Sequence, residues 1–138
     1  MVIMAVADKI DKLSLIYVKD KKLLVARSKG KDVFYLPGGK RETGESDEQA
    51  LRREIKEELS VDIKQHTLKY MDSFERQAHG KPEGLMARLT CYSADLNGIP
   101  RPSSEIEEIA WLGSKDGDKL PAEWVFLLGW LKGKGLID

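Results

Sequence analysis

The sequence predicts an α/β domain in which a mixed β-sheet lies between two helices. Two short segments rich in β-branched and aromatic residues, 13–18 and 23–27, flank a polar turn and are typical of a β-hairpin. The segment 47–59 has no glycine or proline and carries an apolar stripe of helical period. Further strands are expected within 64–75 and over 85–94. A helix could begin at Pro121, followed by an apolar stripe of helical period: Trp124, Leu127, Leu128 and Leu131. Strands, a helix, more strands and a final helix together favour helices on both faces of one sheet.

The helix predicted over 47–59 opens with a capping box formed by Ser46 and Gln49. Its apolar positions share one face that would pack on a core: Leu51, Ile55 and Leu59. A separate acidic stripe lies beside that face: Glu54, Glu57 and Glu58. Carboxylates on adjacent turns repel one another, and Mg²⁺ or Mn²⁺ would offset that repulsion because hard cations take oxygen ligands. The alternative for the stripe alone is a solvated acidic helix face.

Residues on the N-terminal side of this helix add candidates for ligand binding. Gly38 and Gly39 follow a short strand predicted over 33–36 and Pro37, and without a Cβ their backbone can approach a metal or a phosphate closely. Arg27 ends the second strand of the hairpin. It is either a surface cation or a bidentate ligand for a substrate phosphate.

The segment Gly39–Val61 carries the pattern G-x5-E-x7-R-E-U-x-E-E-x-G-U, in which U is a bulky aliphatic residue. This pattern is the Nudix box, and the chain therefore resembles the Nudix hydrolases. The matching positions are Gly39, Glu45, Arg53, Glu54, Ile55, Glu57, Glu58 and Val61. Ser60 stands where the pattern has its second glycine, directly after the helix. A left-handed backbone there would favour glycine, and serine would cost on the order of 1 kcal/mol.

The resemblance implies a single Nudix domain over residues 1–138, folded as an α/β/α sandwich with a mixed sheet between helices. It implies hydrolysis of a phosphoanhydride bond in a nucleoside diphosphate-linked substrate with Mg²⁺, or Mn²⁺, as cofactor. The metal ligands would be Glu54, Glu57, Glu58 and the carbonyl of Gly39. The catalytic set would be Glu54, Glu57 and Arg53, with Glu54 as our candidate for the general base and Arg53 orienting the carboxylates, mainly Glu57. Glu45 would hold the loop to the helix.

A further acid from outside the box often completes such a site, and Glu105, Glu107 and Glu108 compete for that role. If Ile106 faces the core, strand alternation puts Glu105 and Glu107 on the opposite face. Glu105 is our candidate metal ligand because it is nearest to the flexible loop before it. The alternative is an edge strand protected from aggregation by its charges.

Substrate choice rests on weaker signals. ADP-ribose-cleaving members often carry a proline where this chain has Arg76, which argues mildly against that substrate. Members that cleave dinucleoside polyphosphates often carry a tyrosine slightly further on, where this chain has Ala78 and His79. Neither His66 nor His79 is expected to be catalytic. Glu123 and Trp124, in the segment 121–124, resemble the place where nucleotide-sanitising members bind a purine. Core packing of Trp124 and a helix-start acid at Glu123 would explain the same residues without a ligand.

We therefore predict a MutT-like (d)NTP pyrophosphohydrolase that binds substrate through Arg27, Gly38, Gly39, Glu123 and Trp124. The alternatives are a nucleotide-sugar, ADP-ribose-type or other dinucleotide diphosphatase, and a non-catalytic Nudix-fold nucleotide sensor.

Composition limits the remaining possibilities. Lys+Arg and Asp+Glu are both 23, so the formal net charge is zero and a nucleic-acid partner is not expected. The single cysteine, Cys91, excludes an internal disulfide and is expected to be a buried thiol. The apolar run Met1–Ala7 is too short for a signal peptide and no apolar stretch is long enough for a membrane span, so we expect a cytoplasmic protein. The chain would be a monomer, or a homodimer in which Met1–Val6 pairs with a second copy.

Overall fold

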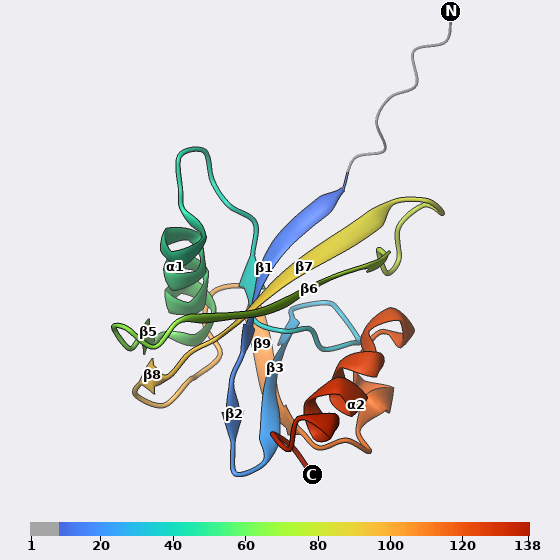
Figure 1. Ribbon diagram of the computed structural model, residues 1–138. Coiled ribbons are helices and arrows are strands. Elements are labelled where there is room, and N and C mark those ends of the chain that lie inside the picture. The colour runs from blue at the N-terminus through green and yellow to red at the C-terminus, as the bar shows by residue number, and fades with distance from the viewer. Residues whose placement is uncertain (1–8) are drawn as a thin grey trace, which may run out of the picture.

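The computed structural model describes residues 9–138, and the expectations for Met1–Ala7 lie outside that range. The described chain forms nine short or medium strands, two 3₁₀ turns and two α-helices (Figure 1). In chain order these are β1 Ile10–Ile16, β2 Val18–Lys19, β3 Lys22–Ser28, β4 Gly38–Gly39, α1 Asp47–Leu59, β5 Asp62–Ile63, β6 Lys69–Gln77, β7 Met86–Ser93, β8 Leu96–Asn97, β9 Ile106–Leu112, η1 Gly117–Lys119, η2 Ala122–Trp124 and α2 Phe126–Gly133.

The central sheet is mixed, as the sequence predicts. Its strand order is β4-β1-β7-β6, with β1 and β7 parallel and the outer pairs antiparallel. A second sheet of order β2-β3-β9 is antiparallel throughout, and β5 pairs with β8 in a small ribbon. The α/β class with a mixed sheet between helices is confirmed, and the strands are divided among three hydrogen-bonded groups.

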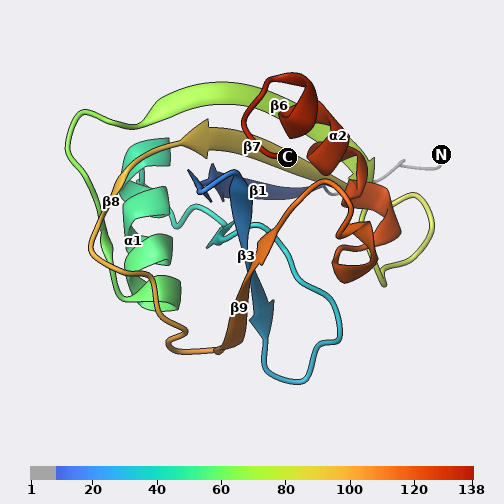
Figure 2. The ribbon, with the colours of Figure 1, turned by 90° about the horizontal axis from the view of Figure 1, so that it is seen from below.

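Two hydrophobic cores on opposite sides of the strands produce the layered fold. Leu24 of β3 packs with the apolar face of α1, whereas its neighbours Leu23 and Val25 pack with α2. Adjacent residues divide in this way because successive side chains of a strand point to opposite faces. The helices accordingly lie on opposite sides of the strands in both views (Figures 1 and 2). No helix among residues 9–138 is long and apolar enough to cross a membrane.

Two local expectations were wrong. The predicted hairpin of 13–18 with 23–27 is formed by β2 and β3, with left-handed Asp20 and Lys21 in its turn, whereas β1 belongs to the central sheet. The strand predicted over 33–36 is a single bridge between Tyr35 and Ala26. A bridge forms there because the surrounding loop returns to β3 at one point and then turns into β4.

The C-terminal half agrees closely with its pattern. β7 lies within the predicted strand 85–94, and Cys91 on it is a buried free thiol. The strand expected within 64–75 begins later, at Lys69, because a turn at 65–66 with a left-handed His66 precedes it. The apolar stripe predicted after Pro121 is buried at every position: Trp124, Leu127, Leu128 and Leu131. The helix itself begins later than expected, at Phe126, and Trp124 lies in the preceding η2.

Candidate metal and substrate site

The glycine pair of β4 connects the central sheet to α1. Gly38 pairs with Ser14 of β1 and has φ 139°, and an added Cβ would lie 2.0 Å from the carbonyl oxygen of Leu13. Only glycine allows this pairing without displacing β1. The same residue donates its backbone N–H to Glu58 Oε1 at 2.9 Å. Gly38 of β4 therefore both pairs with the central sheet and orients the carboxylate of Glu58.

Gly39 faces the middle of α1. A Cβ at Gly39 would lie 2.5 Å from the carboxyl carbon of Glu54, so its hydrogen leaves room for that side chain. The absence of a Cβ brings the Gly39 backbone and the Glu54 carboxylate together, as the glycine loop predicts.

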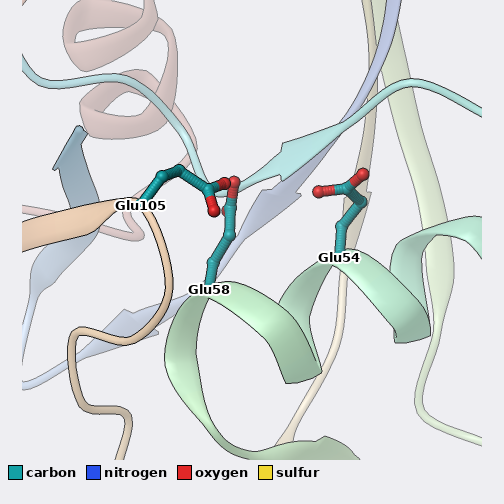
Figure 3. A group of neighbouring side chains, drawn as sticks. All are labelled: Glu54, Glu58 and Glu105. Carbon is teal, nitrogen blue, oxygen red and sulfur yellow. The ribbon is translucent and has the colours of Figure 1, made fainter. Parts of the chain in front are cut away.

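Three carboxylates converge beside β4. Ligand oxygens of Glu54, Glu58 and Glu105 all lie within 4.8 Å of one another, and we call these residues the carboxylate cluster. Figure 3 shows Glu58 from α1 meeting Glu105, with Glu54 one turn earlier on the same helix. Glu57, which the resemblance assigns to the metal, is outside this group, and its side chain is half exposed with Arg53 at 3.6 Å.

The end of α1 holds the loop that carries Glu105. The carbonyls of Glu58 and Leu59 accept the N–H groups of Ser103 and Arg101 at 3.0 and 2.9 Å. The carbonyl of Glu105 itself accepts the N–H of Lys29 at 2.8 Å. The carbonyls at a helix C-terminus have no partner within the helix, and here two of them fix a remote loop. Backbone hydrogen bonds on both sides therefore hold Glu105 beside the helix.

Burial and crowding make the helix carboxylates of the cluster hard to ionise. Glu58 is 8% exposed, and burial first, then Glu54 and Glu105, raise its pKa to about 8 although the Gly38 N–H opposes this. Burial is also the largest cause of the raised pKa of Glu54, which Arg53 opposes. A hydrogen bond from Ser104 is the first cause of the lowered pKa of Glu105.

This donor set fits a hard divalent cation. Three carboxylates with crowded oxygens, two of them with raised pKa values, would be relieved of mutual repulsion by a bound cation. Oxygen ligands without thiol or imidazole favour Mg²⁺ or Mn²⁺ over softer metals.

Arg53 positions the site differently from the expectation that it acts mainly through Glu57. Its guanidinium donates to both oxygens of Glu45 at 2.7 and 2.8 Å and to Glu54 Oε1 at 2.9 Å. It also donates to the carbonyl of Lys40 at 3.1 Å. Glu45 in turn accepts the N–H of Glu42 at 2.7 Å. Arg53 thus ties the glycine loop to the helix and holds Glu54, and Glu45 has the loop-holding place predicted for it.

The expected phosphate-binding role of Arg27 is opposed by its contacts. Its guanidinium forms ion pairs with Glu107 at 2.8 Å and Glu108 at 3.0 Å and donates to the carbonyl of Lys31. Both acids reach it because the β3–β9 register shifts between Arg27 and Ser28, leaving Glu107 as an extra residue. Simple strand alternation therefore failed to separate Glu107 from Glu108. Both are held by Arg27, and neither belongs to the carboxylate cluster.

A cavity of about 470 Å³ adjoins the cluster. Its lining includes Gly38 and Glu58, Lys12 and Tyr35, and the buried Trp124. His79 lies on its wall and contacts Glu123 Oε1 through Nδ1 at 3.1 Å. Of the two predicted base-binding residues, Trp124 lines the cavity. Glu123 is not among the lining residues and contacts the cavity through His79.

Sequence reasoning missed Lys12 and Tyr35 on this wall. Lys12 could have been noticed from strand alternation. It shares a face of β1 with Ile10, Ser14 and Ile16, and the other residues of that face point toward the cavity or the core. Tyr35 carried no signal of its own, since only its bridge to Ala26 aims the ring inward.

The NUDIX domain family matches residues 13–127. The chain belongs to the Nudix family. A Nudix chain of this kind is a hydrolase, and the box at Gly39–Val61 lies within the matched range. No curated protein sequence matches the chain.

Solved Nudix structures share this fold. A chain assigned to the Nudix hydrolase family from Chromobacterium violaceum is 28% identical over 91% of this chain and 78% of its own, with a TM-score of 0.70. The MutT Nudix hydrolase from Burkholderia pseudomallei is 24% identical over 83% and 88%, with a TM-score of 0.64. A UDP-X diphosphatase is 23% identical over 95% and 66%, with a TM-score of 0.68. The last two likenesses concern the fold alone.

Proposed function

We propose that this Nudix hydrolase cleaves a phosphoanhydride bond in a nucleoside diphosphate-linked substrate with Mg²⁺ as cofactor, and with Mn²⁺ as a substitute. The observation that carries the proposal is the carboxylate cluster, of which Glu58 lines an adjoining cavity of about 470 Å³. Glu54, Glu58, Glu105, Glu57 and the Gly39 carbonyl are the proposed ligands. A divalent cation bound there would neutralise phosphate charge and activate the attacking water.

The residues around the cluster are suited to distinct tasks. Glu54, held by Arg53, is the proposed general base toward the attacking water. The Gly38 N–H keeps Glu58 directed at the cluster, and the loop of Glu105 supplies a carboxylate from the opposite side. Cavity walls that bury the substrate would limit access of bulk water to the reacting phosphate.

A nucleoside triphosphate is the substrate that we propose, with cleavage to a monophosphate and pyrophosphate. The half-buried Tyr35 and the buried Trp124 both line the cavity, which gives its wall an aromatic character suited to a base, and the acidic Glu123 contacts His79 on that wall. A UDP-X diphosphatase shares the fold, so a nucleotide-sugar substrate is the second candidate.

A substrate panel tests this proposal. Purified protein would be incubated with Mg²⁺ or Mn²⁺ and with normal and oxidised (d)NTPs, ADP-ribose, NADH and nucleotide sugars, and the phosphate products measured. We expect metal-dependent turnover of one or more (d)NTPs. Turnover of nucleotide sugars alone would favour the second candidate, and no turnover on any substrate would favour the non-catalytic sensor.

Glu57→Gln tests the ligand that lies outside the cluster. We expect folding to be retained, because Glu57 is half exposed, and activity to fall by about 10²-fold or more. Near-normal turnover would mean that the site consists of Glu54, Glu58 and Glu105 without Glu57.

A further inference from the structure

Lys12 is a cation directed into the site from outside the Nudix box. It lies on β1 between Ile10 and Ser14, which line the same cavity, and its side chain is half-buried. Its Nζ lies 5.7 Å from the centre of the Tyr35 ring, a cation–π distance that supports its orientation across the cavity wall.

The ammonium of Lys12 lacks the partner that other inward cations have. Arg27, Arg41 and Arg53 each form ion pairs with two or more carboxylates. Within residues 9–138, no hydrogen bond or ion pair holds Lys12, although Glu58 and Glu54 are close enough to act on it electrostatically. Half-buried cations without partners are costly, so this position favours an anion that arrives with the substrate.

The surroundings of Lys12 favour an anion over a neutral ligand. Burial lowers the pKa of Lys12, and the nearby cations Lys40 and Lys81 lower it further. Lys31 and Lys81 also line the cavity. Several lysines around one concave wall concentrate a polyanion there. At this wall the carboxylate cluster and the lysines adjoin, as a site for a metal–phosphate ligand requires.

We propose that Lys12 binds a phosphoryl oxygen of the substrate. This inference rests on the proposed nucleotide substrate. Lys12 and Glu58 of the carboxylate cluster line the same cavity, and Glu58 is close enough to act on Lys12 electrostatically. A nucleotide whose phosphates are held by a cation at the cluster would therefore bring a phosphoryl oxygen to the ammonium of Lys12.

The test compares ligands that differ by one phosphate, in metal-free protein. Binding of the four nucleoside monophosphates and the corresponding nucleosides would be measured by calorimetry in the full chain and in Lys12→Met. We expect monophosphate affinity to fall by about 10- to 100-fold, as for loss of a charged hydrogen bond, with nucleoside affinity unchanged. Lys12→Arg should recover part of the loss, since it restores the charge.

Controls separate this role from a structural one. Lys22→Met removes an exposed lysine of β3 that is outside the cavity, and it should change neither affinity. Lys12→Met should unfold at the same temperature or higher, because it replaces a desolvated charge with an apolar side chain. Its Mn²⁺ affinity should be equal or greater, because a positive charge near the carboxylates is removed.

Three results would overturn the inference. One is unchanged monophosphate affinity in Lys12→Met, and another is an equal loss of monophosphate and nucleoside binding. The third is a wild-type protein that binds no monophosphate. The protein could bind monophosphates in a manner that depends on Lys12 and yet hydrolyse no nucleotide. That result would support the role of Lys12 and reject the proposed catalytic function.

Discussion

The acids around the N-terminus of α1 and those of its second half have opposite environments. Glu45 and Asp47, the paired acids, face arginines, which are the largest cause of their lowered pKa values. Glu54 and Glu58, the crowded acids, have raised pKa values first because they are buried and then because other carboxylates, Glu105 among them, lie nearby. Acidic residues stabilise the fold at one place and form a ligand site two or more turns later. Burial separates the two roles, since Arg53 donates to Glu45 and Glu54 alike and only Glu54 has a raised pKa.

Substitution of a crowded acid is expected to have the largest effect on activity. Glu58→Gln keeps the shape of the side chain and an oxygen for the Gly38 N–H, so we expect the protein to fold. It removes a carboxylate that a bound cation would hold in its ionised form, and kcat/KM should fall by at least about 10²-fold. Steady-state kinetics on the substrate identified in the panel, with a thermal unfolding curve, measure both effects.

Glu107→Gln is the matched control, because Glu107 is an acid of the same region that pairs with Arg27 at 2.8 Å. Glu107 is half exposed and lies outside the carboxylate cluster, so kcat/KM should stay within about twofold of wild type. Equal losses in the two variants would contradict the division between crowded and structural acids.

Gly39→Ala tests the crowded acids through the backbone. The added Cβ would lie 2.5 Å from the Glu54 carboxyl carbon, so Glu54 must move away from the cluster. We expect Mn²⁺ affinity and kcat/KM to fall about 10- to 100-fold, as for other changes that misplace a ligand. Gly44→Ala is the control. It has no neighbour within 4 Å but φ 85°, so it should reduce stability by about 1 kcal/mol and leave metal affinity unchanged.

The parts of the site that the sequence predicted are the local ones. Ser46 and Gln49 form the predicted capping box, and Ser60 has the left-handed backbone expected after the helix. Each of these features is set by residues close by in the sequence. The spacing of Glu54 and Glu58 follows from the helix itself. Such features depend on a few consecutive residues, which a single sequence displays directly.

The missed parts depend on register between distant strands. Lys12 and Tyr35 meet because the loop after β3 bridges back to Ala26, and Arg27 is occupied because one extra residue in β9 brings Glu107 beside it. Neither register is encoded in a short motif. Glu105 could be proposed from its position before β9, but its place beside Glu58 requires the helix-end carbonyls that hold its loop.

Glu45→Gln tests the paired acids by pH. Arg53 first, and then the N–H of Glu42, lower the pKa of Glu45 to about 2. An acid with a lowered folded-state pKa contributes stability above its unfolded value, near 4.5, and loses it as pH falls toward 2. The wild type should therefore unfold at a higher temperature than Glu45→Gln at pH 7, and the difference should vanish near pH 2. A difference independent of pH would exclude the ion pair as its cause.

Ser60→Gly is expected to have the smallest effect, at the end of α1 that holds the Glu105 loop. Ser60 has φ 55° and ψ 33°, the left-handed conformation in which the Nudix pattern has glycine. Glycine should raise the free energy of unfolding by roughly 0.5–1 kcal/mol, measured by urea denaturation, with kcat/KM unchanged. Ser60→Ala keeps the Cβ and should give no gain. A change in kcat/KM in Ser60→Gly would show that strain at Ser60 helps to position Glu58 and Glu105.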